Sequence, residues 1–232
     1  MTFAEFQKKY YLSRHDISRK TYLENRKTIL IKKEATAVKN LDIIYGATLK
    51  IANKKGFQAM TMRDLSREAG MSMGSLYTYF TSKEDLLKTL QEQHSSFFAH
   101  ILEERIGEES HPVAKLHTAI LTHLYLSEAM QPWFYFSYME AKNLPRPEKE
   151  KAVASELETE IMIRDVLVQG QQEGVFYPHD PQMGAGVIKA MLQDWYLKRS
   201  KHARREVSVD QYAAYLQKFI EAFFLKQAGK PG

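Results

Sequence analysis

Apolar residues recur every three or four positions along most of the chain after residue 36, which is the spacing of one face of an α-helix. The longest series runs from Leu86 to Arg105 and is followed by Gly107, a residue type that often ends a helix. Further series of the same kind cover residues 113–124, 153–168, 183–195 and 212–223. A short extended stretch is expected only at Val175–Tyr177. The pattern predicts an all-α protein of about nine helices.

Residues 41–90 contain short predicted helices with recognisable start and stop signals. Thr61 and Asp64, three positions apart, form a capping box that opens a short helix. Gly70 then permits a tight turn, and Ser72 caps another helix of barely two turns. A helix, a glycine-containing turn and a short capped helix make the helix-turn-helix pattern, whose second helix enters the major groove of DNA.

Composition and charge narrow the function classes. The 232 residues include no cysteine, which excludes disulfides, thiolate nucleophiles and zinc-thiolate or iron-sulfur sites. The first 90 residues carry 17 Lys and Arg against 9 Asp and Glu, whereas residues 91–232 carry 16 against 19. This asymmetry predicts a basic nucleic-acid or membrane-surface module joined to a near-neutral body. Because no apolar run approaches the roughly 20 residues of a membrane-spanning helix and the start lacks a signal core, we expect a cytoplasmic protein without a membrane partner.

The segment 41–90 resembles the DNA-binding domain of TetR-family transcriptional regulators. The matching residues are Lys55, Gly56, Phe57, Thr61, Leu65, Ala69, Gly70, Met71, Ser72, Gly74, Leu76, Tyr77, Tyr79, Phe80, Ser82, Lys83, Leu86 and Leu87. The resemblance implies an N-terminal three-helix helix-turn-helix DNA-binding domain and a C-terminal helical ligand-binding and dimerisation domain. The expected regions are a basic extension at 1–36, the DNA-binding domain at 37–84 and the ligand domain at 85–228. Residues 142–151, which contain two prolines, predict a loop in the last region.

The resemblance also assigns DNA contacts. Met73 and Gly74 are expected to face base edges, and phosphates are expected at Thr61, Tyr77, Tyr79 and Lys83. Small or hydroxyl side chains beside them complete the candidate DNA-binding set: Ser72, Ser75 and Thr78. Many family members carry a basic residue where Met73 stands. Met73 therefore either contacts a thymine methyl group or packs on the domain surface.

The basic extension at 1–36 is open to two interpretations. Its Lys and Arg side chains could follow the DNA backbone or enter the minor groove as a flexible arm. Alternatively, Ile17, Tyr22 and Ile29 allow a helix that packs on the body, or the segment is a solvated tail.

An aromatic segment lies at 133–139 and is apolar all round, which suggests full burial as core or as the wall of a pocket. The family resemblance implies a ligand cavity, and the candidate wall residues are Phe98, Leu102, Leu121, Leu124, Trp133, Tyr135, Tyr138, Gln169 and Trp195. The histidines show no metal-ligand spacing, so no metal is expected, and His117 or His123 could orient a ligand. The basic cluster at 198–205 is a solvated loop by default or, alternatively, a site for coenzyme A phosphates.

The function that follows is a ligand-responsive transcriptional regulator and repressor. It would bind a palindromic operator in double-stranded DNA as a homodimer, pair through its last two helices and be released by a small apolar or aromatic effector. No catalytic residue and no cofactor are needed. An architectural or cell-division DNA-binding protein of the same fold, without an effector, is the alternative. An enzyme ranks third, because the chain has no glycine-rich phosphate loop, nucleophile elbow or clear carboxylate pair.

Overall fold

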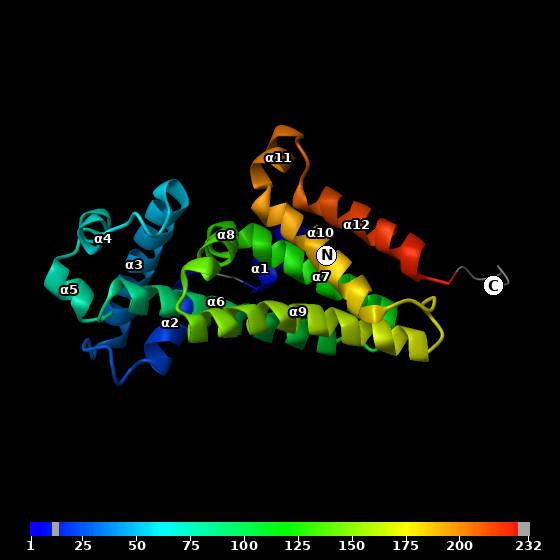
Figure 1. Ribbon diagram of the computed structural model, residues 1–232, viewed down its shortest axis with the longest axis horizontal. Coiled ribbons are helices and arrows are strands. Elements are labelled where there is room, and N and C mark those ends of the chain that lie inside the picture. The colour runs from blue at the N-terminus through cyan, green and yellow to red at the C-terminus, as the bar shows by residue number, and fades with distance from the viewer. Residues whose placement is uncertain (11–13, 227–232) are drawn as a thin grey trace. The chain divides into compact units, whose positions relative to one another are not determined.

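The computed structural model describes residues 1–10 and 14–226, and these residues form α-helices joined by short connections (Figure 1). The helices are α1 (Phe3–Tyr10), α2 (Arg14–Glu24), α3 (Glu34–Lys55), α4 (Met62–Ala69), α5 (Met73–Tyr77), α6 (Lys83–Gly107), α7 (Pro112–Ala129), α8 (Gln131–Glu140), α9 (Arg146–Gln172), α10 (Pro181–Leu197), α11 (Arg199–Arg204) and α12 (Val209–Phe224), with a 3-10 helix η1 (Ala141–Asn143). In the described ranges, extended pairing is limited to one antiparallel bridge between Phe176 and Leu225. The all-α prediction is confirmed.

Two details of the predicted helix pattern are wrong. The described residues form twelve α-helices and not about nine, because the N-terminal extension contains α1 and α2 and the basic cluster folds as the short α11. The predicted loop at 142–151 is mostly helical, since α9 already begins at Arg146. Pro147 lies in the first turn of α9, where a missing backbone N–H breaks no helical hydrogen bond.

The chain divides into two compact units. The head unit comprises Tyr10–Phe97 and Pro132–Ala154, and the body unit comprises Met1–Lys9, Phe98–Gln131 and the chain from Ser155 onward. Helices α6 and α9 contribute residues to both units, and the change of unit in α6 falls between Phe97 and Phe98. The expected functional boundary after residue 84 stays a prediction.

In the head unit, α3 is the central helix and contacts both α2 and α4. One face of α3 is buried, including Leu41, Ile44 and Tyr45. The Tyr45 hydroxyl donates to Thr21 of α2 at 3.1 Å, and its ring meets Trp133 of α8 edge-on at 5.4 Å. The aromatic helix α8 is therefore part of the core of the head unit.

In the body unit, α7 packs against α10 and α12. The buried Tyr125 of α7 donates its hydroxyl to Asp210 of α12 at 2.6 Å. Helix α1 covers the same tyrosine with Phe6, whose ring centroid lies 5.4 Å from that of Tyr125, and the Phe3 amide donates to Asp210 at 2.9 Å. The first helix of the chain is thus held by specific contacts on α7 and α12.

Candidate functional site

The helix-turn-helix is α4, the turn at Gly70 and α5, shown in cyan to teal in Figure 1. Thr61 and Asp64 form the predicted capping box. The Asp64 amide donates to the Thr61 hydroxyl oxygen at 3.1 Å, and the Thr61 amide donates to the Asp64 carboxylate at 3.0 Å. The hydrogen bond from Lys55 and those from Thr61 hold the pKa of Asp64 well below its usual range. Gly70 has φ +64°, a left-handed conformation that a side chain would strain. Local chemistry therefore fixes both ends of α4.

Helix α5 has one buried and one accessible side. Leu76 is fully buried, whereas Ser72, Gly74 and Tyr77 are exposed and Met73, Ser75 and Thr78 are half-buried. Ser72 caps the helix by accepting the Ser75 amide at 3.1 Å, as predicted. The candidate base-contacting residues therefore lie on a short helix with small side chains at its start.

The candidate phosphate-contacting residues differ in their exposure and in the hydrogen bonds that they already form within the protein. Tyr77 is 48% exposed, so its hydroxyl is accessible to a ligand. Tyr79 is 6% exposed, burial raises its pKa, and its hydroxyl oxygen accepts a hydrogen bond from Asn40 at 2.8 Å. The Tyr79 hydroxyl proton is thus retained and available for donation. Lys83 donates to the Gln58 carbonyl at 2.9 Å and lies over the Phe57 ring, and burial lowers its pKa.

The N-terminal extension is folded where the structure describes it. Ile17 and Tyr22 of α2 are buried, as is Ile29 in the connection that follows, so the alternative of a packed helix applies to α2. The solvated-tail interpretation is excluded for α2, which lies along α3.

The aromatic helix α8 has different surroundings from those expected. Trp133 stacks on His94 and packs edge-on against Tyr45, and Phe136 packs against Phe57. Trp133 is thus a core residue of the head unit, and Tyr138 is 44% exposed. The expectation that this segment is buried all round is wrong, because only one side of α8 faces the core.

A buried carboxylate completes the attachment of α8. Glu140 is 7% exposed, accepts the Phe57 amide at 3.0 Å and accepts Asn143 at 2.5 Å. It therefore satisfies a backbone donor in the turn between α3 and α4 that would otherwise be buried unpaired. Nothing in the local sequence signals this role for a glutamate at the end of an aromatic run.

The candidate wall residues fall into both units. Those in the head unit are Trp133, Tyr135 and Tyr138, and those in the body unit are Phe98, Leu102, Leu121, Leu124, Gln169 and Trp195. Trp195 is fully buried, and its indole N–H donates to Glu128 at 3.0 Å. Gln169 accepts Lys115 at 2.8 Å and donates to Glu173 at 2.7 Å. Trp195 is therefore a core residue, and Gln169 belongs to a polar network.

A polar pair that the sequence did not single out lies inside the body unit. Lys189 of α10 is 8% exposed, and its Nζ lies 3.2 Å from Nε2 of the buried His123 on α7. Burial lowers the pKa of Lys189 to about 8, although Glu156 and Glu160 of α9 oppose this effect. A lysine in the series 183–195 has no sequence feature that distinguishes it from an exposed one.

An apolar groove of about 350 Å³ runs between α10 and α12. Its lining includes Met183 and Val187 from α10 and Phe219 and Phe223 from α12. These four side chains are between 53% and 66% exposed, which is unusual for residues of this size and polarity.

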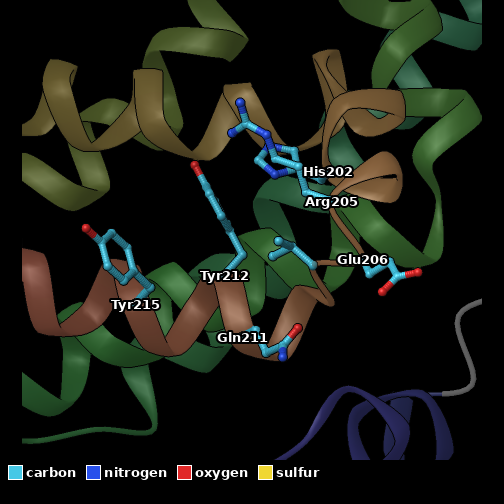
Figure 2. A pocket seen from close by; sticks show the side chains of 7 residues that line it. His202, Arg205, Glu206, Gln211, Tyr212 and Tyr215 are labelled. Atoms are coloured by element: carbon cyan, nitrogen blue, oxygen red, sulfur yellow. The ribbon is translucent and has the colours of Figure 1, made fainter.

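A second pocket, of about 440 Å³, lies where α11 meets the start of α12 (Figure 2). Tyr212 and Tyr215 rise from α12, with His202 and Arg205 near the opposite wall, and Glu206 points away. Burial and the nearby Asp194 raise the pKa of Tyr212 to about 12, so its hydroxyl stays protonated and donates to the Met191 carbonyl at 2.7 Å. No sequence pattern connects the basic cluster with Tyr212 and Tyr215.

Most cations of that basic cluster are already paired. Although burial raises the pKa of Asp194, hydrogen bonds from Lys198, Lys201 and His202 together hold it well below its usual range. Arg199 forms two hydrogen bonds of 2.9 Å with Glu128. The default interpretation of 198–205 as a solvated loop is wrong, since the segment folds as α11 and is tied by ion pairs.

Comparison with known proteins identifies the family to which the chain belongs. The family model for bacterial regulatory proteins of the tetR family matches residues 44–90, and the model for the tetracyclin repressor-like C-terminal domain matches residues 109–220. The chain belongs to the TetR family of helix-turn-helix transcriptional regulators, which confirms the resemblance. The second model spans most of the body unit and also residues 132–154 of the head unit. Among residues 1–10 and 14–226, none of the helices combines the length and the hydropathy of a membrane-spanning segment.

Individual relatives are similar over most of the chain. The HTH-type transcriptional regulator HbdR of Aromatoleum sp. (strain CIB) is 23% identical over 75% of this chain and 76% of its own length. The fold matches that of AibR in complex with isovaleryl coenzyme A and operator DNA, with a TM-score of 0.67, 19% identity and coverage of 78% of this chain and 96% of AibR. It also matches FadR from Bacillus subtilis in complex with stearoyl-CoA, with a TM-score of 0.64, 18% identity and coverage of 77% and 96%.

Proposed function

We propose that the protein is a transcriptional repressor that binds a palindromic operator as a homodimer and is released by a small apolar or aromatic effector. The observation that carries the proposal is the geometry of α4, Gly70 and α5. The short helix α5 is fixed by its buried Leu76 and by caps at both helices, and its other side is accessible. A helix held in this way can enter the major groove without rearrangement.

Direct contacts with the operator would come from a small group of side chains. The half-buried Met73 and the exposed Gly74 open α5, and a methionine suits an apolar contact with a thymine methyl group. Tyr77 would donate to a phosphate from an exposed position, and Tyr79 from one fixed by Asn40. Thr61, Ser72, Ser75 and Thr78 would add hydroxyl contacts beside them.

Lys83 supports the same site with its remaining donors. Its ammonium has three N–H groups, and one is used by the Gln58 carbonyl. The other two could bind a phosphate oxygen while the contact with Phe57 keeps the side chain in place. A phosphate contact and a structural role are thus compatible at this position.

A homodimer through α10 and α12 would explain the apolar groove. Exposed Met183, Val187, Phe219 and Phe223 lie on these two helices, and pairing with a second copy would remove them from water. A two-fold interface buries the same surface on both subunits, and a palindromic operator reflects that symmetry.

The effector would bind in the body unit, next to α6 and α7. Phe98, Leu102 and Leu124 are buried on these helices and Leu121 is half-buried, so an apolar ligand would find aliphatic and aromatic contacts there. AibR and FadR were captured with isovaleryl and stearoyl coenzyme A, whose acyl groups are apolar, and this supports such thioesters as the first effectors to screen. Binding would shift the population towards a form with lower operator affinity.

Selection of DNA sequences by the purified protein, followed by footprinting, tests the proposal. We expect a site with two inverted half-sites and a complex that contains two protein chains. A selected site with one unrepeated half-site, or no enrichment of any sequence, would contradict it. Isovaleryl and stearoyl coenzyme A, added to the complex, test release.

A further inference from the structure

The connection between α2 and α3, residues 25–33, is held against the end of α5. The Leu30 amide donates to the carbonyl of Thr78, the C-cap residue of α5, at 3.1 Å. The Tyr22 hydroxyl donates to the Lys32 carbonyl at 2.9 Å, and the Ile29 side chain between them is buried. This segment, which we call the α2–α3 connector, therefore has a fixed position beside the residues that follow Tyr77.

The connector presents cations without counter-ions. Arg26, Lys27, Lys32 and Lys33 are exposed, and none of the four has an ion pair within the described parts of the chain. The nearest acidic residues in sequence are otherwise engaged, since Glu34 pairs with Arg19 at 3.0 Å and Glu24 accepts Gln93 at 2.6 Å. Four unneutralised positive charges in nine residues repel one another and favour binding to a polyanion.

The connector also exposes an apolar side chain at this position. Leu30 is 63% exposed, although its own amide is hydrogen-bonded to Thr78. Exposure of a single leucine needs no explanation by itself, but here it lies among the four cations. A surface that is cationic with an apolar centre suits the sugar-phosphate backbone, where charged oxygens alternate with apolar deoxyribose faces.

We propose that the α2–α3 connector is a second DNA-contact surface, whose Arg26, Lys27, Lys32 and Lys33 bind operator phosphates next to those reached by Tyr77. The inference rests on the proposed DNA-binding function and adds to it. The contacts would be to phosphates, because three of the four residues are lysines, whose ammonium groups supply charge without the planar array of donors that suits base edges. They would raise affinity for all sequences and make it more dependent on salt.

This assignment divides the basic N-terminal extension into two parts. Helix α1 belongs to the body unit, where Phe6 is buried against Tyr125 and the Phe3 amide is bound by Asp210. Its exposed Lys8 is therefore outside the connector. A deletion of the whole extension would mix the two roles, and substitutions separate them.

The test compares two paired substitutions, Arg26→Gln with Lys27→Gln and Lys32→Gln with Lys33→Gln. The control pair, Lys8→Gln with Lys218→Gln, removes the same charge from exposed positions of the body unit. Fluorescence anisotropy with the selected operator gives the binding constant between about 50 and 200 mM KCl. Each lost phosphate contact should reduce the slope of log K against log salt by about 0.9, so each connector pair should lose about 1.8 per protomer. The control pair should retain the wild-type slope.

A charge-conserving variant tests whether a reduced salt slope comes from lost charge or from a disturbed connector structure. Lys32→Arg with Lys33→Arg keeps both charges and should keep the slope, whereas an equal loss in this variant would overturn the proposal. Connector variants that match the control pair at every salt concentration would overturn it as well. Failure of the wild-type protein to bind any duplex would instead refute the proposed function, so the two failures are distinguishable.

Discussion

Replacement of the buried Lys189 by methionine should stabilise the protein at neutral pH and remove a rise in stability at alkaline pH. Burial lowers the pKa of Lys189 from 10.5 to about 8, and the nearby Glu156 and Glu160 only partly offset this effect. The difference corresponds to roughly 3 kcal/mol of unfavourable free energy for the charged form in the folded state. A buried charge replaced by an apolar residue of similar length commonly leaves stability unchanged or increases it.

The direction of the pH dependence follows from the proton balance. Between pH 8 and 10.5 the folded state has released the Lys189 proton while the unfolded state still holds it, so the unfolding free energy rises with pH. Below pH 8 both states are protonated and the full penalty applies. The Lys189→Met variant has no such group, but it loses the hydrogen bond to His123, which costs about 1 kcal/mol. We therefore expect a net gain of about 2 kcal/mol at pH 7 and no gain at pH 10.5.

Urea denaturation at several pH values, at one protein concentration, measures this difference directly. The Lys8→Met variant is the matched control, because it removes a lysine from an exposed position of the same unit. Its unfolding free energy should differ from that of the wild type by the same amount at every pH. Parallel pH profiles for Lys189→Met and the wild type would refute the reasoning, as would a large loss of stability in Lys189→Met at pH 7.

Four further outcomes are expected. Glu140→Ala should lower the unfolding free energy by about 1 to 3 kcal/mol, because the Phe57 amide is left buried without an acceptor. Glu140→Gln should lower the unfolding free energy less, and thermal denaturation of both variants measures the difference. Lys83→Ala should weaken binding to all duplexes alike and reduce the salt slope by about 0.9 per protomer, and an unchanged slope would limit Lys83 to its structural contacts. Phe219→Glu should yield monomers in analytical ultracentrifugation, since a carboxylate would be desolvated in the proposed interface, and an intact dimer would place that interface elsewhere. Leu121→Trp should keep operator affinity and lose the response to effector, whereas a destabilised variant that still responds would refute the proposed wall.

The helix-turn-helix could be predicted from the sequence because its information is local. The capping box of Thr61 and Asp64 and the turn at Gly70 depend on residues within four positions of one another, and the structure confirms both. The cap at Ser72 is of the same kind. Such signals are independent of tertiary context, and for this reason the resemblance to the family was strongest there.

The aromatic helix α8 shows where local information ends. The stretch from Trp133 to Met139 is apolar on every side, so its periodicity does not specify which side is covered or by which helix. In the folded chain Trp133 packs on Tyr45 and Phe136 on Phe57, across 79 or more residues of sequence. The hydrogen bond from the Phe57 amide to the Glu140 carboxylate also attaches α8, and hydrophobic patterns do not register polar groups of this kind.

In the N-terminal extension, the number of positive charges can be read from the sequence, but their positions in the fold cannot. The sequence alone is compatible with a flexible arm or with a packed helix. In the structure, α2 is a packed helix, and the connector that follows is exposed but held in place. The buried Ile17 and Tyr22 attach α2 to the head unit, and the amide of Leu30 holds the connector at Thr78. A fixed connector loses less conformational entropy on binding than a free arm with the same charge. Its phosphate contacts would therefore contribute more affinity per cation, which is the physical reason to test these four residues before the rest of the extension.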